Sequence, residues 1–176
     1  MEYFNYMRSG KKLLVIVDPS FESLFKRIRQ HNLNSSVALK ADTIQHLVFI
    51  LGSFDKVSSY SANYEAKTEV LPLANVAGML PGKTKPDEYV IFSGHYDHLG
   101  IVPAIEGDSI ANGADDDASG TTAVITLAKY FKKLNKNART LIFVTFTAEE
   151  LGGFGSQYFS KQVDPDKTVA MFNIEM

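Results

Sequence analysis

One short segment, residues 141–146, constrains the fold most because it is apolar on both of its faces. Its sequence is Leu-Ile-Phe-Val-Thr-Phe. Successive side chains of a β-strand point to opposite faces of the sheet, so a strand with one exposed face alternates apolar and polar residues. This segment does not alternate, which predicts a central strand covered by helices on either side.

Strands and helices alternate around this segment from about residue 70 onward. We expect further strands over 75–80, 88–93 and 169–174, the last of them buried, and helices over 119–134 and 152–161. This order predicts an α/β fold with a mostly parallel (mixed) sheet between helices. Ligands of such sheets gather at the carboxyl ends of the strands.

The first third of the chain has a different pattern. Residues 13–17 form a short apolar strand, Asp18 and Pro19 are typical of a helix start, and apolar side chains then recur at helical spacing. Further strands are predicted over 47–51 and 58–64. We therefore expect a small α/β segment over residues 1–69, separate from a larger domain over 70–176.

Composition excludes several classes of function. The 176 residues carry 18 basic and 20 acidic side chains, which argues against a nucleic-acid partner. No apolar run approaches the roughly 20 residues that span a membrane, and the N-terminus lacks the layout of a signal peptide. The compartment stays open, including a periplasmic or secreted parent protein. Because the chain has no cysteine, any metal ion must bind to His, Asp and Glu.

Three acid-rich turns follow or precede the apolar segments, at residues 94–97, 113–120 and 148–150. The middle turn contains Asp115, Asp116 and Asp117, whose like charges repel unless a cation or hydrogen-bond donors neutralise them. A calcium loop of the EF-hand type requires a different order of acids. The turns predict a divalent metal site, with a solvated acidic loop as the alternative.

His95 and Asp97 are two residues apart, so on a strand they point the same way. Asp97 can then orient His95, as a carboxylate often does for a metal-bound imidazole. By the same alternation His98 is expected to face away from the site. His95 by itself would be explained equally well as an ordinary half-buried histidine, and the neighbouring turns are what favour a ligand.

Glu149 and Glu150 follow the apolar central strand directly. Adjacent side chains diverge at a strand end, so one carboxylate can bind a metal while its neighbour acts as a general base. A surface pair of glutamates without a function is the alternative.

The sequence resembles the family of co-catalytic zinc aminopeptidases and carboxypeptidases that includes relatives of bacterial leucyl aminopeptidase, glutamate carboxypeptidase II and glutaminyl cyclase. The matching segments are residues 94–97 (Gly-His-Tyr-Asp), 112–120 (Asn-Gly-Ala-Asp-Asp-Asp-Ala-Ser-Gly) and 147–150 (Thr-Ala-Glu-Glu), followed by Gly155 and Ser156. The resemblance covers roughly residues 70–176 and implies a zinc-exopeptidase-like sandwich that hydrolyses peptide substrates with a zinc-activated water.

The resemblance also implies a role for each matching residue. His95 and Asp116 would bind zinc, with Asp116 bridging two ions. Glu150 would bind the second zinc and Glu149 would be the general base. Asp97 would support His95. Asp117 would follow a cis peptide bond.

Two departures from the family pattern stand out. Glu175 occupies the position where the family usually has an aspartate ligand, and a frayed terminal residue is its alternative reading. The family's last ligand is a histidine beyond this strand, and none of the chain's four histidines, His31, His46, His95 and His98, fits that role. We therefore expect an N-terminal half of a catalytic domain, with a sheet truncated on its C-terminal side.

Several expectations follow from that truncation. Residues 1–69 would resemble part of a protease-associated insert domain. The chain would hold one zinc ion or none, where the intact family site holds two, and would self-associate through exposed core surface. An aminopeptidase is favoured. The alternatives are a catalytically incomplete fragment acting at most as a binding module, and a single-zinc enzyme similar to glutaminyl cyclase.

Overall fold

The structure is a computed structural model that describes residues 2–33, 37–38, 47–63 and 68–176. The chain divides into two compact units, Met1–Val70 and Leu71–Met176. The sequence placed a boundary between residues 69 and 70. Among the described helices, none is long and apolar enough to cross a membrane.

The first unit is built around two parallel strands, β1 and β2, in which Leu13 lies opposite Leu47. Its elements are α1 (Glu2–Met7), β1 (Leu13–Val17), the 3₁₀-helix η1 (Pro19–Phe21), α2 (Glu22–Leu33) and β2 (Leu47–Leu51). The Asp18 carboxylate accepts a hydrogen bond of 2.8 Å from the Ser20 amide, which satisfies a free donor at the start of η1. The predicted strands 13–17 and 47–51 and the helix start at Asp18 are confirmed.

The strand predicted over 58–64 is wrong for the described part of that range. Residues 58–63 form neither helix nor strand, and Tyr64 lies outside the described residues. The segment is mostly small and polar, and Ser58 to Asn63 are all exposed, so it has no apolar face to bury against a sheet.

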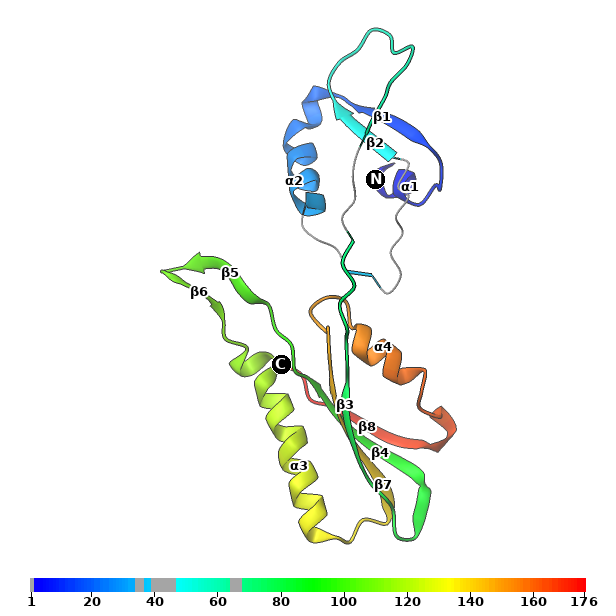
Figure 1. Cartoon of the computed structure of the whole chain (residues 1–176), viewed down its shortest axis with the longest axis vertical. Coiled ribbons are helices and arrows are strands. Elements are labelled where there is room, and N and C mark those ends of the chain that lie inside the picture. The colour runs from blue at the N-terminus through cyan, green and yellow to red at the C-terminus, as the bar shows by residue number, and fades with distance from the viewer. Residues whose placement is uncertain (1, 34–36, 39–46, 64–67) are drawn as a thin grey trace. The chain divides into compact units, whose positions relative to one another are not determined.

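The second unit contains a four-stranded sheet in the order β3-β7-β4-β8 (Figure 1). Strand β4 is parallel to both of its neighbours, and β3 is antiparallel to β7. The elements of this unit are β3 (Val76–Leu80), β4 (Lys85–His95), β5 (Gly100–Ile105), β6 (Asp108–Ala111), the π-helical turn η2 (Ala114–Ser119), α3 (Gly120–Leu134), β7 (Arg139–Phe146), α4 (Phe154–Ser160), the 3₁₀-helix η3 (Pro165–Lys167) and β8 (Thr168–Asn173). The predicted α/β fold with a mostly parallel, mixed sheet is confirmed.

Strand β7 is buried on both faces, as its sequence predicted. Leu141 and Phe143 belong to the core cluster under α3, whereas Ile142 and Val144 belong to the cluster that includes Phe159 of α4. Figure 1 shows the two helices on opposite sides of the sheet. The two-residue alternation of the strand thus supplies one apolar row to each layer.

Strand β8 is not buried, contrary to the expectation for residues 169–174. Val169, Met171 and Phe172 are 53%, 46% and 53% exposed. Within the described residues β8 pairs only with β4, so it forms an edge of the sheet and one of its sides stays open. Self-association through such exposed core surface stays a prediction.

A β-hairpin that the sequence analysis did not predict joins β4 to η2. Its strands β5 and β6 are antiparallel and project from the sheet (Figure 1). Glu106 and Gly107 at the turn have φ angles of 52° and 90°. Two positive φ angles are typical of the tight turns that close hairpins, so the Glu-Gly pair between Ile105 and Asp108 was the available signal.

Candidate metal centre

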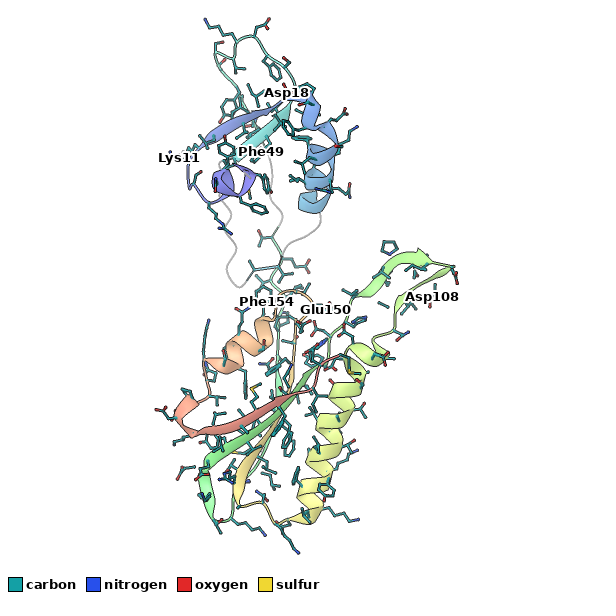
Figure 2. The ribbon with its side chains drawn as sticks, turned by 180° about the vertical axis from the view of Figure 1, so that it is seen from behind. Lys11, Asp18, Phe49, Asp108, Glu150 and Phe154 are labelled. Carbon is teal, nitrogen blue, oxygen red and sulfur yellow. The ribbon has the colours of Figure 1, made fainter. Side chains whose placement is uncertain are left out.

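The acid-rich turns meet at one end of the sheet because β4 and β7 run parallel and end together. His95 is the last residue of β4 and lies opposite Phe146, the last residue of β7. Glu149 and Glu150 follow β7, and Figure 2 shows Glu150 at this end of the sheet. The carboxyl ends of parallel strands are where ligands of open α/β sheets bind.

The first ligand group is centred on His95, which is 1% exposed. Its Nε2 lies 2.8 Å from Asp116 Oδ1 and 3.0 Å from Glu175 Oε1. The three side chains could together hold a metal ion. Glu175 therefore contacts the site and is not a frayed end.

The main chain of Asp97 orients the His95 ring. The Asp97 carbonyl oxygen lies 2.8 Å from His95 Nδ1, so Nδ1–H donates to it in the tautomer that leaves Nε2 for a metal. The Asp97 carboxylate, to which the sequence analysis assigned this role, lies 3.8 Å from Nδ1. It accepts instead from the amides of Glu149 at 3.1 Å and Glu150 at 3.3 Å.

This difference has a simple cause. Strand β4 ends at His95, so Asp97 belongs to the following turn and the alternation of a strand no longer directs its side chain. Its carboxylate ties the turn after β7 to the turn after β4. Asp97 thereby fixes the backbone that carries Glu149 and Glu150.

The second ligand group contains His98, which was expected to face away. His98 Nδ1 lies 2.6 Å from Glu150 Oε1 and 3.8 Å from Asp116 Oδ2. The expectation was wrong for the same reason, because residue 98 lies beyond the strand end. The turn after β4 brings His98 close to the acidic turns. His98, Asp116 and Glu150 could also hold a metal ion. The sequence could have indicated the direction of His98 only if it had shown that β4 ends at His95.

Asp116 and Asp117 of the middle acidic turn make different kinds of contact. The peptide bond between them is cis, as the resemblance implied. Asp116 contacts both histidines, whereas Asp117 is 2% exposed and accepts hydrogen bonds from the amides of His95 at 2.9 Å and Gly120 at 3.1 Å. A Cβ at Gly94 would lie 2.8 Å from Asp117 Oδ2, so the buried carboxylate requires a glycine there.

Asn75 holds the turn that carries the two glutamates, a role the sequence analysis missed. Its Nδ2 donates to the Gly155 carbonyl at 2.8 Å, and its Oδ1 accepts from the Thr147 amide at 3.2 Å. Asn75 therefore clamps both ends of the loop between β7 and α4. The loop includes Ala148, whose φ of 55° is rare for a residue with a side chain.

Two groups of the site have shifted pKa values. Burial alone would lower the pKa of His95, but the hydrogen bond to Asp97 and the charges of Glu175, Asp117 and Glu149 raise it overall. Desolvation by the surrounding groups raises the pKa of Glu149, and the charges of Glu175, Glu150 and Asp97 add to this against the opposing effect of His95. A carboxyl group with a raised pKa is suited to accept a proton near neutral pH.

Several buried polar atoms of the site lack hydrogen-bond partners, as expected of a site for a cation. Among the described residues, four buried side-chain atoms lack a hydrogen-bond partner, and three of them are here: His98 Nδ1, Asp116 Oδ1 and Glu150 Oε1. Buried polar atoms without partners are costly and rare in folded proteins. Cations in the two ligand groups would satisfy these atoms, and a donor set of imidazole nitrogen and carboxylate oxygen fits zinc.

Known proteins with similar sequences are peptidases. A probable zinc metalloprotease of Pyrenophora teres f. teres is 34% identical over 106 residues, which are 59% of this chain and 22% of that protein. Aminopeptidase NAALADL1 of Mus musculus is 29% identical over 133 residues, 71% of this chain and 16% of that protein. A solved structure, the aminopeptidase from Aneurinibacillus sp. strain AM-1, is 30% identical with a TM-score of 0.46, over 58% of this chain and 24% of that chain.

A match to a known protein family covers nearly the whole second unit. The chain spans about a quarter or less of the length of the three relatives just described. The pattern of "Peptidase family M28" matches residues 75–176, more than half of the chain, and includes every ligand and base considered above. The chain belongs to peptidase family M28.

Proposed function

We propose that the second unit carries the catalytic centre of a zinc-dependent aminopeptidase, as the N-terminal half of its catalytic domain, and that the first unit is part of a protease-associated-like insert. The observation that carries this proposal is that His95, Asp116, Glu150 and Glu175 meet at the carboxyl end of the sheet, where Asp116 Oδ1 and Glu150 Oε1 are buried without hydrogen-bond partners. Membership of a peptidase family and the names of the relatives support the same reaction class.

The ligands divide between two positions that share Asp116. His95, Asp116 and Glu175 would hold one zinc ion, and Glu150 would help hold a second. When bound, zinc would supply a Lewis acid that polarises the scissile carbonyl group and lowers the pKa of water. The Asp97 carbonyl keeps His95 Nε2 free for this purpose.

Glu149 would act as the general base. It is exposed, so a substrate can reach it, and its raised pKa matches the proton transfer required. Its carboxylate would take a proton from the attacking water and give it to the amine nitrogen that leaves. The hydrogen bond from the Glu149 amide to Asp97 holds the base in position.

A zinc and peptidase assay tests this proposal. The zinc content of the purified full chain would be measured together with the hydrolysis of N-terminal amino-acid anilides, for the wild type, Glu149→Gln and the control Asp115→Asn. Asp115 is an exposed neighbour outside both ligand groups.

We expect zinc-dependent turnover that a chelator abolishes and added zinc restores. Glu149→Gln should keep its zinc and lose turnover, whereas Asp115→Asn should keep both. Near-zero turnover of the zinc-loaded wild type with fewer than two ions per chain would instead favour a binding module. Cyclisation of N-terminal glutamine with a single zinc would favour the cyclase.

A further inference from the structure

Two pairs of polar side chains follow each other where β4 and β8 run parallel. Ser93 lies opposite Asn173 in the ladder between these strands. Two residues further along each segment, His95 Nε2 lies 3.0 Å from Glu175 Oε1. We propose that Asn173, anchored by Ser93, is a positioning residue that directs the Glu175 carboxylate toward a cation in the first ligand group. The inference rests on the proposed function, since it concerns a ligand of the same centre.

A chain of hydrogen bonds connects Ser93 to this ligand. The Ser93 hydroxyl donates to Asn173 Oδ1 at 2.7 Å. Asn173 Nδ2 in turn donates to Glu175 Oε2 at 3.2 Å, whereas the other carboxylate oxygen, Oε1, contacts His95. The amide therefore occupies one oxygen of Glu175 and leaves the other for the ion. Hydrogen-bond partners of this kind orient carboxylate ligands and raise the affinity for the metal.

The chemistry of the three groups gives this chain of hydrogen bonds one direction. An ionised carboxylate only accepts, so the part of the Asn173 amide that faces Glu175 must be its NH₂ donor. The amide oxygen then faces Ser93, whose hydroxyl donates to it. Ser93 is 0% exposed, so solvent does not compete for this hydroxyl. Turning the amide over would place two acceptor oxygens against each other, so Ser93 and Glu175 together fix its orientation.

The backbone holds the two pairs in register. The Ile174 amide donates to the Ser93 carbonyl at 2.8 Å, which extends the pairing of β8 with β4 beyond Asn173. Residues two apart on a paired segment share a face of the sheet, so Asn173 and Glu175 point the same way. The contact between the amide and the carboxylate is therefore built into the ladder.

A role in folding alone does not require this amide. Asn173 is exposed, so water can replace its hydrogen bonds at little cost to the fold. The direction of the Glu175 carboxylate, in contrast, has no such substitute, because mobile water does not fix a side chain. Loss of the amide should accordingly affect metal binding more than stability.

Removing the amide tests the proposal. The full chain would be stripped of metal and titrated with Co²⁺, whose visible absorption reports binding. We expect Asn173→Ala to weaken the tightest-bound ion by about 10–100-fold, the usual effect of losing a hydrogen-bond partner of a ligand. Ser93→Ala should weaken it less, because the amide keeps its bond to Glu175. Thr168→Ala is the matched control, since it removes a hydrogen bond of 2.9 Å at the other end of β8 and should leave the affinity unchanged.

A second background separates positioning from a structural role. In Glu175→Ala the ligand that Asn173 positions is absent, so adding Asn173→Ala should cause no further loss of affinity. Equal fold losses in the two backgrounds would show that Asn173 acts through the general stability of β8, and would overturn the proposal. Wild-type affinity in Asn173→Ala would overturn it as well.

The remaining controls keep the two proposals apart. Circular dichroism and urea unfolding of the metal-free variants check that each one folds, and Ser93→Ala takes the place of Asn173→Ala in both backgrounds if the latter does not fold. A folded wild type that binds neither Co²⁺ nor Zn²⁺ would refute the proposed function itself. Metal binding that is insensitive to Asn173 and Ser93 would refute only their positioning role.

Discussion

The two ligand groups share Asp116 but differ in what holds their histidines. His95 ends a central strand, its ring donates to Asp97, and its main chain is bound by the Asp117 carboxylate and by the Thr121 hydroxyl at 2.6 Å. His98 lies in the turn beyond the strand, is 21% exposed, and its Nδ1 has no hydrogen-bond partner. The first group is held by hydrogen bonds within the protein, whereas Nδ1 of His98 in the second group has none.

This difference affects how tightly each group can bind an ion. A preorganised group loses little conformational entropy when the ion binds, whereas a group on a turn must be ordered at that moment. We therefore expect the His95 position to fill first and the His98 position to fill at higher metal concentration.

Removing the shared carboxylate should have the largest effect. Asp116→Ala deletes an oxygen ligand from both positions, so we expect affinity for both ions to fall by more than about 100-fold and peptidase turnover to disappear. Metal analysis after gel filtration measures the ions retained. Asp115→Ala is the matched control, and equal zinc contents in the two variants would contradict the shared role of Asp116.

Glu149→Gln should abolish proton transfer while sparing both ligand groups. We expect turnover to fall by about 10²–10⁴-fold, the usual contribution of a general base, with two ions still bound. Steady-state kinetics and metal analysis on the same sample separate the two effects. If turnover persists at the wild-type level, another group must be the base.

Asp117→Ala should weaken the His95 group selectively. The variant leaves the buried amides of His95 and Gly120 without their carboxylate partner, and hydrogen bonds to charged groups contribute about 1.5–3 kcal/mol each. We expect the free energy of unfolding in urea, measured without metal, to fall by at least about 2 kcal/mol. An unchanged midpoint would show that Asp117 does not anchor β4. Asp115→Ala again serves as the control.

Asn75→Ala should instead weaken the second group. Without the clamp, the loop that carries Glu149 and Glu150 is less fixed, and about 1–2 kcal/mol of stability is lost with the two hydrogen bonds. Co²⁺ titration should show a larger loss of affinity at the weaker position than at the stronger one. Asn75→Asp, which keeps the oxygen that accepts from Thr147, should show a smaller loss. Equal losses at both positions would argue against a selective role.

The smallest effect is expected at the opposite end of β4. Hydrogen bonds from Lys85 and Arg139 lower the pKa of Glu88 below its ordinary value of 4.5. A lowered folded pKa stabilises the protein above the unfolded pKa, and this contribution is lost as the pH falls through the folded pKa. Glu88→Gln should make the free energy of unfolding fall slightly less steeply as the pH is lowered. The effect is small because the Glu88–Arg139 pair is exposed. A change in metal binding would be unexpected.

Much of the fold could be inferred from local pattern. The apolar residues of 141–146 predicted a doubly covered central strand, and the structure buries Leu141 to Val144 in two separate core clusters. The order of strands and helices predicted a sheet with ligands at the carboxyl ends of its strands, and His95 lies there at the end of β4, opposite the end of β7. Where a segment lacked such a pattern, as over residues 58–63, the expected strand did not form.

The periodic patterns of the sequence predict side-chain directions within strands, but not in the turns that follow them. The sequence established which residue types could bind metal, and the family resemblance assigned His95, Asp116 and Glu150 their expected roles. The direction of His98, the use of the Asp97 carboxylate to bind two amides, and the Asn75 clamp arise from turns, where no period links sequence spacing to side-chain direction. Contacts between residues distant in the chain set these directions, so only the tertiary structure could bring a second histidine to Asp116.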